Sequence, residues 1–240
     1  MRSRRLLFVT AAALVAAPAA HAQVFQGVDA STPIRRLYGG LNGLVSVPQG
    51  EFRDFIKTGG GIGGHFIYQL DRSGVLALRL DVGGVMYGNE RTRACFSPPI
   101  GCRIELEVNT SNNIFLGGIG PQLMVPTGTF TPYVAGTIGF AYFFTESSIE
   151  GTGSDVSFAD TNNFDDGTLA WTALAGVYIP IRKGARPISL DLGASYHWNG
   201  EASYLRPGSI QDFPDGSIQI NPLRSETNLL VFRLGITARF

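Results

Sequence analysis

The sequence predicts an all-β protein, an eight-stranded antiparallel transmembrane up-and-down β-barrel. Three observations support this prediction. Segments of about ten residues alternate apolar and polar side chains. No segment after the N-terminal region has the roughly 18 consecutive apolar residues that a spanning helix needs, although 44% of the residues are hydrophobic and only 16% are charged. The connections between the alternating segments are short and long in turn, as in closed membrane barrels.

The N-terminal region has the composition of a secretory signal peptide. A start with three arginines precedes an apolar run over 6–17, and a small-x-small cleavage site follows at 20–22. This order of a basic, an apolar and a small-residue region predicts that residues 1–22 are removed on export. A membrane-anchoring helix is the weaker alternative, because the run is short and Pro18 follows it directly.

Removal of the signal peptide sets the charge of the mature chain. The full sequence has 19 basic and 19 acidic residues, and residues 1–22 contain three Arg and no acid, which leaves a net charge of −3. A mildly acidic chain is not expected to bind nucleic acid. Residues 23–37 are predicted to be a short periplasmic lead, and residues 38–240 a single barrel domain with both ends in the periplasm.

Eight alternating segments account for the barrel, an even number as closed antiparallel barrels of one chain require. Three connections are tight and rich in Gly, Pro or charge, and three are long and polar. Short turns belong on the periplasmic side and long loops outside. The predicted strands are 38–47, 61–70, 75–87, 113–125, 131–145, 168–181, 188–198 and 228–240. The tight turns are 71–74, 126–129 and 182–187, and the long loops are 88–112, 146–167 and 199–227.

Two of the loops carry additional features. The first external connection, 48–60, is of intermediate length, and its Phe52, Phe55 and Ile56 are expected to rest on the barrel rim. In the last loop, the sequence Pro-Gly-Ser-Ile at 207–210 is echoed by Asp-Gly-Ser-Ile at 215–218. Turn residues between such segments predict a hairpin that extends the barrel wall beyond the membrane.

Period-two alternation assigns the two faces of each strand, most clearly in 75–87 and 188–198. The apolar rows, for example Leu76, Leu78 and Leu80, are expected to face lipid, and the polar rows the lumen. An unpaired charge in hydrocarbon costs several kcal/mol, so the charged side chains should pair inside and fill the lumen. The predicted lumen ion-pair network comprises Arg79, Asp81, Asp191, Arg233 and Arg239, with Arg233 and Arg239 directed at the two aspartates. The other side chains predicted to face the lumen are His65, Gln69, Gln122, Thr137, Thr172, Tyr178 and Thr237.

Aromatic side chains on the outward rows should mark where the bilayer ends. Two girdles are predicted, the outer one from Tyr142, Phe144, Trp171, Tyr196 and Trp198, and the inner one from Tyr68 and Phe240. Pro121 departs from this regular pattern, because a closed barrel has no free edge for a proline. It predicts a bulge in the fourth strand or an error in the strand assignment.

The last strand alternates up to the terminal aromatic residue. Its apolar row is Leu230, Phe232, Leu234, Ile236, Ala238 and Phe240. This pattern resembles the closing strand of bacterial outer-membrane β-barrels, and the resemblance implies that Leu230, Phe232, Leu234, Ile236 and Phe240 form a signal for the barrel-assembly machinery. The whole mature chain resembles the small barrels typified by the transmembrane domain of OmpA and by OmpX-like proteins. That resemblance implies a bacterial outer-membrane location and contact with outer-membrane lipid and lipopolysaccharide.

Two cysteines lie close together in the second external loop. Cys95 and Cys102 flank a segment that contains Pro-Pro-Ile-Gly. In an exported chain, an even pair this close predicts a disulfide that staples the loop tip. A metal site would need further ligands, and a redox pair would more often be Cys-x-x-Cys.

No cofactor or metal is expected. Phosphate-binding loops, zinc signatures and dinucleotide fingerprints are missing from the sequence. The third external loop holds Asp155, Asp160, Asp165 and Asp166, but Phe164 occupies a position where a calcium loop would want an oxygen ligand. A solvated acidic loop is therefore the favoured interpretation.

One segment raises the question of catalysis. Tyr196-His197-Trp198-Asn199 resembles the outer-membrane lipid A deacylases, whose catalytic His is followed two residues later by the nucleophilic Ser. Asn199 stands at that position here, so only Ser195 or a residue of another strand such as Thr172 offers a hydroxyl to the base. The simpler interpretation of His197 is a rim residue bonded to loop backbone.

The favoured function is a non-enzymatic outer-membrane barrel with a charge-filled lumen and long external loops for surface interaction or envelope integrity. An external protein or surface ligand would be its partner. The alternatives are a small porin or lateral channel for apolar solutes, and a lipid A-modifying hydrolase. A soluble lipocalin-like barrel or sandwich would place the apolar rows inside and the polar rows outside.

Overall fold

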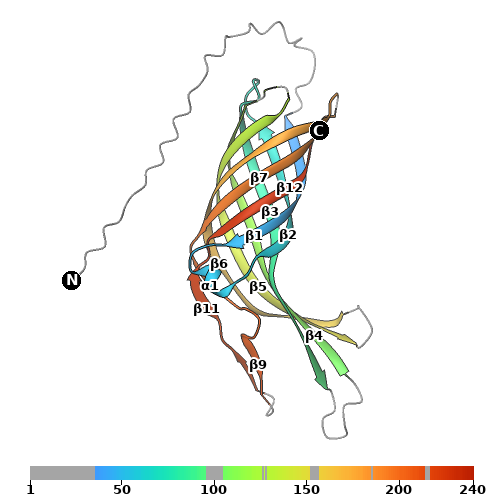
Figure 1. Ribbon diagram of the computed structural model, residues 1–240, viewed down its shortest axis with the longest axis vertical. Coiled ribbons are helices and arrows are strands. Elements are labelled where there is room, and N and C mark those ends of the chain that lie inside the picture. Colours follow the sequence, from blue (N-terminus) through green and yellow to red (C-terminus); the bar gives the residue numbers. More distant parts are fainter. Residues whose placement is uncertain are drawn as a thin grey trace, which may run out of the picture. The chain divides into compact units, whose positions relative to one another are not determined.

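Figure 1 shows the structure, a computed structural model. It describes residues 36–95, 105–125, 127, 129–151, 157–184, 186–213 and 217–240. The predicted signal peptide and almost all of the predicted periplasmic lead lie outside these ranges. Within them, no helix is both long and apolar enough to cross a bilayer.

Eight antiparallel strands close into a barrel in the order β1-β12-β7-β6-β5-β4-β3-β2 (Figure 1). The closure is direct, because β1 pairs with β2 on one side and with β12 on the other, from Tyr38 opposite Arg239 to Pro48 opposite Leu229. The predicted fold class and all eight predicted strands are confirmed. The barrel strands are β1 Leu37–Pro48, β2 Gly59–Gln69, β3 Leu76–Cys95, β4 Glu105–Met124, β5 Thr131–Gly151, β6 Ser157–Arg182, β7 Ile188–Asn199 and β12 Leu229–Arg239.

Short elements gather at one end of the barrel, which we call the loop end; the opposite end, which holds the tight connections, is the turn end. The connection after β1 contains α1 (Phe52–Phe55). The connection between β7 and β12 holds two small antiparallel pairs, β8 (Glu201–Tyr204) with β11 (Leu223–Glu226) and β9 (Ile210–Asp212) with β10 (Ile218–Ile220). The β9–β10 pair confirms the hairpin predicted from the repeated Gly-Ser-Ile sequence.

Two segments predicted to be long loops are largely strand. β3, β4, β5 and β6 continue past the barrel wall and form a four-stranded sheet that projects at the loop end (Figure 1). We call this part, residues 88–95, 105–112, 146–151 and 157–167, the extension. Most side chains on both of its faces are polar, so the regular apolar alternation that reveals a membrane strand is missing there. Cross-strand bonds between polar side chains, such as Thr110 Oγ1 to Ser147 Oγ at 2.7 Å, stabilise the pairing instead.

The prediction of a bulge or a misassigned strand at Pro121 is wrong. β4 passes through this position with an unchanged register, in which Ile119 pairs with Ile138 and Gln122 with Ala135 of β5. Pairing to β5 is interrupted only at Gly120 and Pro121, while pairing to β3 continues through both residues. The barrel therefore accommodates the missing amide hydrogen of proline by losing local pairing on one side. The irregularities of register lie toward the two ends of the barrel, for example between Met86 and Gly88 near the extension and between Pro180 and Arg182 at the turn end, as is common at barrel rims.

The barrel exposes its apolar rows and buries its polar rows. In β3, Leu78 and Leu80 are each 41% exposed, whereas Arg79 between them is fully buried. The same arrangement is found in β7, where Leu192 faces outward and Asp191 is fully buried. This pattern is the reverse of the one that a water-soluble barrel needs, so the soluble alternative is wrong. The large exposed hydrophobic side chains of the wall include Leu41, Ile62, Phe66, Val134, Ile138, Phe140, Leu234 and Ile236.

Glycines allow β4 and β5 to approach closely. A Cβ atom added to Gly139 would overlap the backbone carbonyl oxygen of Gly117, and one added to Gly120 would overlap that of Gly136. We expect Gly139→Ala to lower the free energy of unfolding by about 1–3 kcal/mol, as overpacking typically does. Urea unfolding in detergent micelles measures this difference. Gly84→Ala is the matched control, because an added Cβ there meets nothing within 4 Å. Equal unfolding midpoints for the two variants would contradict the steric explanation.

Candidate functional site

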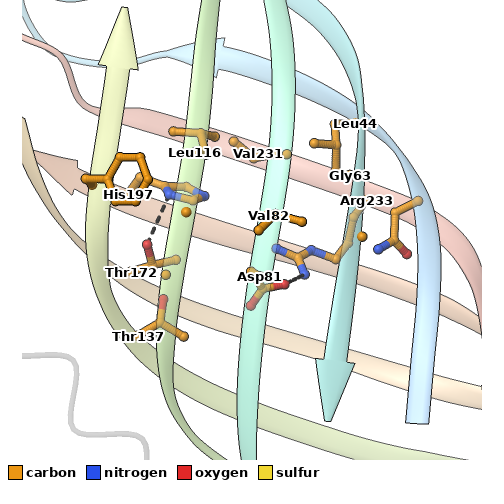
Figure 2. Close-up of a pocket in the computed structure, with 16 residues that line it drawn as sticks. Leu44, Gly63, Asp81, Val82, Leu116, Thr137, Thr172, His197, Val231 and Arg233 are labelled. Atoms are coloured by element: carbon orange, nitrogen blue, oxygen red, sulfur yellow. Dashed lines mark hydrogen bonds and ion pairs between the residues drawn. The ribbon is translucent and has the colours of Figure 1, made fainter. Parts of the chain in front are cut away.

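A charged layer joins opposite parts of the wall across the lumen. Arg79 of β3 donates from Nε to Asp81 Oδ2 at 2.6 Å and from Nη2 to Asp81 Oδ1 at 2.8 Å. Arg233 of β12 donates from Nη1 to the same Oδ1 at 2.9 Å (Figure 2). Because β1 and β2 separate β3 from β12 around the barrel, Asp81 holds together two strands that do not pair with each other.

The third guanidinium nitrogen of Arg79, Nη1, reaches the other side of the lumen. It donates to Gln122 Oε1 and to Tyr178 Oη, both at 2.9 Å. The guanidinium carbon lies 5.6 Å from the ring centroid of Tyr133, and this ring stacks on Tyr178 at 4.4 Å. Arg79 thus has an ion-pair partner, two further hydrogen bonds and an aromatic ring contact. A fully buried cation needs such partners to offset the loss of water.

The predicted ion-pair network is only partly brought together. Asp191 does not join the Asp81 cluster; it accepts a hydrogen bond from Tyr133 Oη at 2.7 Å, and His65 Nδ1 lies 3.9 Å from its second oxygen. The prediction for Arg239 is wrong, because its guanidinium lies 6.0 Å from the ring of Tyr38. The register explains this result: Asp191 stands opposite Gly235, and Arg239 lies further toward the turn end, opposite Tyr38.

Apolar side chains pack together inside the barrel at the loop end, and we call this cluster the plug. Phe52 of α1 is fully buried and packs edge-on against Tyr87, Phe143 and Tyr204, with ring centroids 6.0, 5.9 and 4.8 Å away. The expectation that Phe52 and Ile56 rest on the rim is wrong, since Ile56 is also buried in this cluster. Only Phe55 remains 40% exposed. Apolar residues on the lumen side of the strands extend the plug, among them Leu44, Val85, Ile114, Leu116 and Val231.

Little space is left between the charged layer and the plug. Asp81, Arg233, His197, Thr172 and Thr137 line an internal cavity of about 40 Å³ (Figure 2). A water molecule needs about 10–15 Å³ of such a volume, so the cavity has room for about three waters. A hollow of about 330 Å³ lies at the turn end. Within the described residues, the plug and the charged layer thus follow one another along the lumen.

Two hydroxyls and an imidazole meet beside this cavity. His197 Nε2 lies 3.0 Å from Ser195 Oγ. On the other side of the ring, His197 Nδ1 lies 3.0 Å from Thr172 Oγ1 (Figure 2). The first distance suits a nucleophile and its base. A hydroxyl, however, takes the position that a carboxylate has in a catalytic triad, and Ser195 is 1% exposed on the lumen side. His197 is therefore bonded to two side-chain hydroxyls, and the expected bond to loop backbone is not its role.

Several lumen residues escaped the sequence analysis. Tyr133 and Phe143 lie on the same alternating row of β5 as Thr137, which was assigned to the lumen. The period-two alternation that places Thr137 in the lumen also places Tyr133 and Phe143 there, so this signal could have found both. Phe52 lies in a loop, where no periodicity reports burial.

The predicted girdle residues lie on the outer face of the barrel. Trp171 of β6 and Trp198 of β7 stand opposite each other and are 59% and 50% exposed. Tyr68 and Phe240 are exposed near the turn end. Along β12, Phe232, Leu234 and Ile236 are also exposed. Their roles in anchoring the barrel and in directing its assembly remain predictions.

The disulfide prediction lies outside the described residues, because Cys102 falls between the described ranges. Asp155 of the acidic loop also lies outside them. Asp166 of that loop accepts hydrogen bonds from the Ser203 and Gly167 amides at 2.7 and 2.8 Å, and chiefly the Ser203 bond lowers the pKa of its carboxyl group. Asp166 thus fastens β8 to β6. Among the residues that the structure describes, no three His, Cys, Asp or Glu side chains are grouped as metal ligands.

No protein-family model and no curated protein sequence matches the chain. Among solved structures, it is similar to Neisserial surface protein A (NspA), with 12% identity, 85% of this chain and 97% of that chain covered, and a TM-score of 0.38. It is also similar to Ail, the attachment invasion locus protein of Yersinia pestis (11%, 86% and 100%, 0.43), and to a major outer membrane protein from Thermus thermophilus (13%, 85% and 99%, 0.38). The assignment of the fold rests on the strand pairing of the chain itself.

Proposed function

We propose that this protein is an integral barrel of the bacterial outer membrane that conducts no solute and displays the extension and the β9–β10 hairpin for binding at the cell surface. It acts without catalysis. The observation that carries the proposal is the pair of barriers across the lumen, the apolar plug around Phe52 and the charged layer around Arg79.

The membrane location is supported by the outer face of the barrel. Side chains such as Leu41 and Ile62 are 77% and 78% exposed on it, and a continuous apolar exterior is unstable in water. A bilayer covers such a surface, while each strand's backbone groups are paired with those of its neighbours around the closed barrel. The predicted signal peptide, and the resemblance of the last strand to an assembly signal, favour the outer membrane. The tight connections then face the periplasm, as do the start of β1 and the end of β12.

A binding role is supported by the length of the strands that continue beyond the barrel wall. The four longest strands, with 20 to 26 residues, are the four that continue from the barrel wall into the extension. This is about twice the roughly ten residues that are needed to cross a bilayer as a tilted strand. Membrane spanning does not require the additional length, so it is available for contacts outside.

Hydrolysis of lipid A receives little support. The Ser195 hydroxyl and His197 lie on the lumen side of β7, whereas lipid surrounds the outer face. The pair is separated from the exterior by the plug at the loop end. Expression of the protein should therefore leave the mass spectrum of lipid A unchanged.

Single-channel recording in planar bilayers tests the proposal. We expect no steady conductance from the purified, refolded protein, because any path must pass both barriers. Heat-modifiable migration of the reconstituted sample on gels verifies that folded barrels are present, so that silence is not caused by missing protein. A steady, large conductance would refute the closed lumen and favour a small porin.

A further inference from the structure

We propose that a groove at the loop end binds a neutral oligosaccharide. The groove lies between one face of the extension and the β9–β10 hairpin and has a volume of about 400 Å³, within the range of ligand-binding sites. This inference rests on the external display in the proposed function. It does not depend on whether the lumen conducts.

Most side chains of the wall that the extension contributes carry uncharged hydroxyl or amide groups, and Val108 and Glu90 complete it. The hydroxyl and amide groups come from neighbouring strands and bond to one another, as in Thr110 Oγ1 to Ser147 Oγ at 2.7 Å and Asn163 Nδ2 to Ser147 Oγ at 2.6 Å. A hydroxyl can both donate and accept, so each group keeps further capacity toward the groove. Such a surface matches the mixed donors and acceptors of a sugar.

Asn112 supplies a donor that has no partner of its own. It lines the groove and is 1% exposed. Its Oδ1 accepts a hydrogen bond from Thr145 Oγ1 at 2.7 Å, which fixes the orientation of the amide. Its Nδ2 then has no hydrogen-bond partner within the described part of the chain. A buried donor without a partner costs about 1–3 kcal/mol, and an acceptor oxygen of a bound ligand would satisfy it.

Aliphatic side chains form the facing wall. Ile210, Ile218 and Ile220 lie on one face of the β9–β10 hairpin, and Ile210 pairs with Ile220. Ile218 is 65% exposed and Ile220 is 39% exposed. The hairpin lies beyond the barrel wall, so these aliphatic side chains are not covered by lipid. A ligand with CH groups on one side and hydroxyls on the other, as a pyranose ring has, fits between the two walls.

The charged groups of the groove already have protein partners. Glu90 Oε2 accepts a hydrogen bond from the Gly208 amide at 2.8 Å, which fastens the hairpin to β3. The guanidinium of Arg206 lies 5.9 Å from the ring of Phe55. With one acid and one base, the groove has no excess of positive charge for a sulfated or phosphorylated ligand. An added peptide strand would use the backbone of a sheet edge, whereas the groove presents side chains on a sheet face.

Binding to immobilised glycans tests the inference. The probes are neutral tri- to hexasaccharides of glucose, galactose and N-acetylglucosamine, with heparin oligosaccharides and an unstructured peptide library as the competing classes. We expect the full-length folded protein in detergent to bind at least one neutral class and neither competitor. Failure to bind any neutral class would overturn the inference, as would binding of heparin or peptide alone. Neither result would affect the conductance test.

Variants locate the site. Asn112→Asp replaces the free donor with an acceptor, and we expect it to weaken binding roughly tenfold or more. Asn109→Asp is the matched control on the opposite face of β4, and it should bind like the unmodified protein. If Asn112→Asp does not fold, Ile218→Ser tests the other wall, because its exposed side chain is not needed for folding; it should also weaken binding. The assignment would be contradicted if the single variants Ile218→Ser and Asn112→Asp both kept the affinity of the unmodified protein. It would also be contradicted if Asn112→Asp and Asn109→Asp lost the same affinity.

Discussion

Replacing Arg79 with Met should destabilise the folded barrel by about 3 kcal/mol, near the lower end of the cost of breaking a buried charge pair. Met keeps most of the side-chain volume, so the loss reports on charge and hydrogen bonds and not on a cavity. Gln122 Oε1 and the Tyr178 hydroxyl would each lose a bond from Nη1. The cost stays near 3 kcal/mol because Asp81 keeps Arg233 at 2.9 Å.

The unfolding can be followed by tryptophan fluorescence in lipid vesicles during a urea titration. Both tryptophans, Trp171 and Trp198, lie on the outer face and leave the bilayer when the barrel unfolds. Arg91→Met is the control on the same strand: Arg91 is an exposed residue 3.6 Å from Glu107, and an exposed ion pair contributes about 0–1 kcal/mol. If the two variants lose the same stability, Arg79 does not hold the lumen together.

Replacing Phe52 with Ala should also be costly, by about 3–5 kcal/mol. Phe52 is fully buried and is in ring contact with Tyr87, Phe143 and Tyr204, so its removal leaves a cavity in the plug. Urea unfolding measures the loss. In planar bilayers the variant should nevertheless remain closed, because the charged layer around Arg79 and Asp81 still crosses the lumen beneath the plug.

Phe55→Ala is the matched control in the same short helix. Phe55 is 40% exposed, and its ring contact is with Arg206, a cation–π interaction of about 0.5–1 kcal/mol at an exposed site. Steady conductance in Phe52→Ala would mean that the plug alone closes the lumen. Equal stabilities of the two variants would mean that burial of Phe52 contributes nothing to the fold.

The alternation of side chains by itself determined the strands that cross the membrane and their two faces. A bilayer imposes one requirement on every strand, apolar outward, so Leu78, Arg79 and Leu80 reveal their orientation locally. The same requirement identified the segments that form the barrel strands. Closure of these strands into a barrel then required the first to pair with the last, as it does in the structure. It also identified Ser195 and Thr172 as the hydroxyls near His197, because neighbouring strands share an inward row.

Tertiary structure alone decided which inward residues meet and what lies beyond the membrane. Asp81 binds Arg79 and Arg233, while Asp191 binds Tyr133 and Arg239 lies over Tyr38. These partners depend on strand tilt and register around a closed ring, which local alternation does not encode. The extension was predicted as loops, since a sheet wetted on both faces has no apolar period. Phe52 becomes part of the plug only because α1 enters the mouth of the barrel, and Asn112 lines the groove only because the β9–β10 hairpin lies over the extension. The burial of both residues depends on contacts between segments that are distant in the chain.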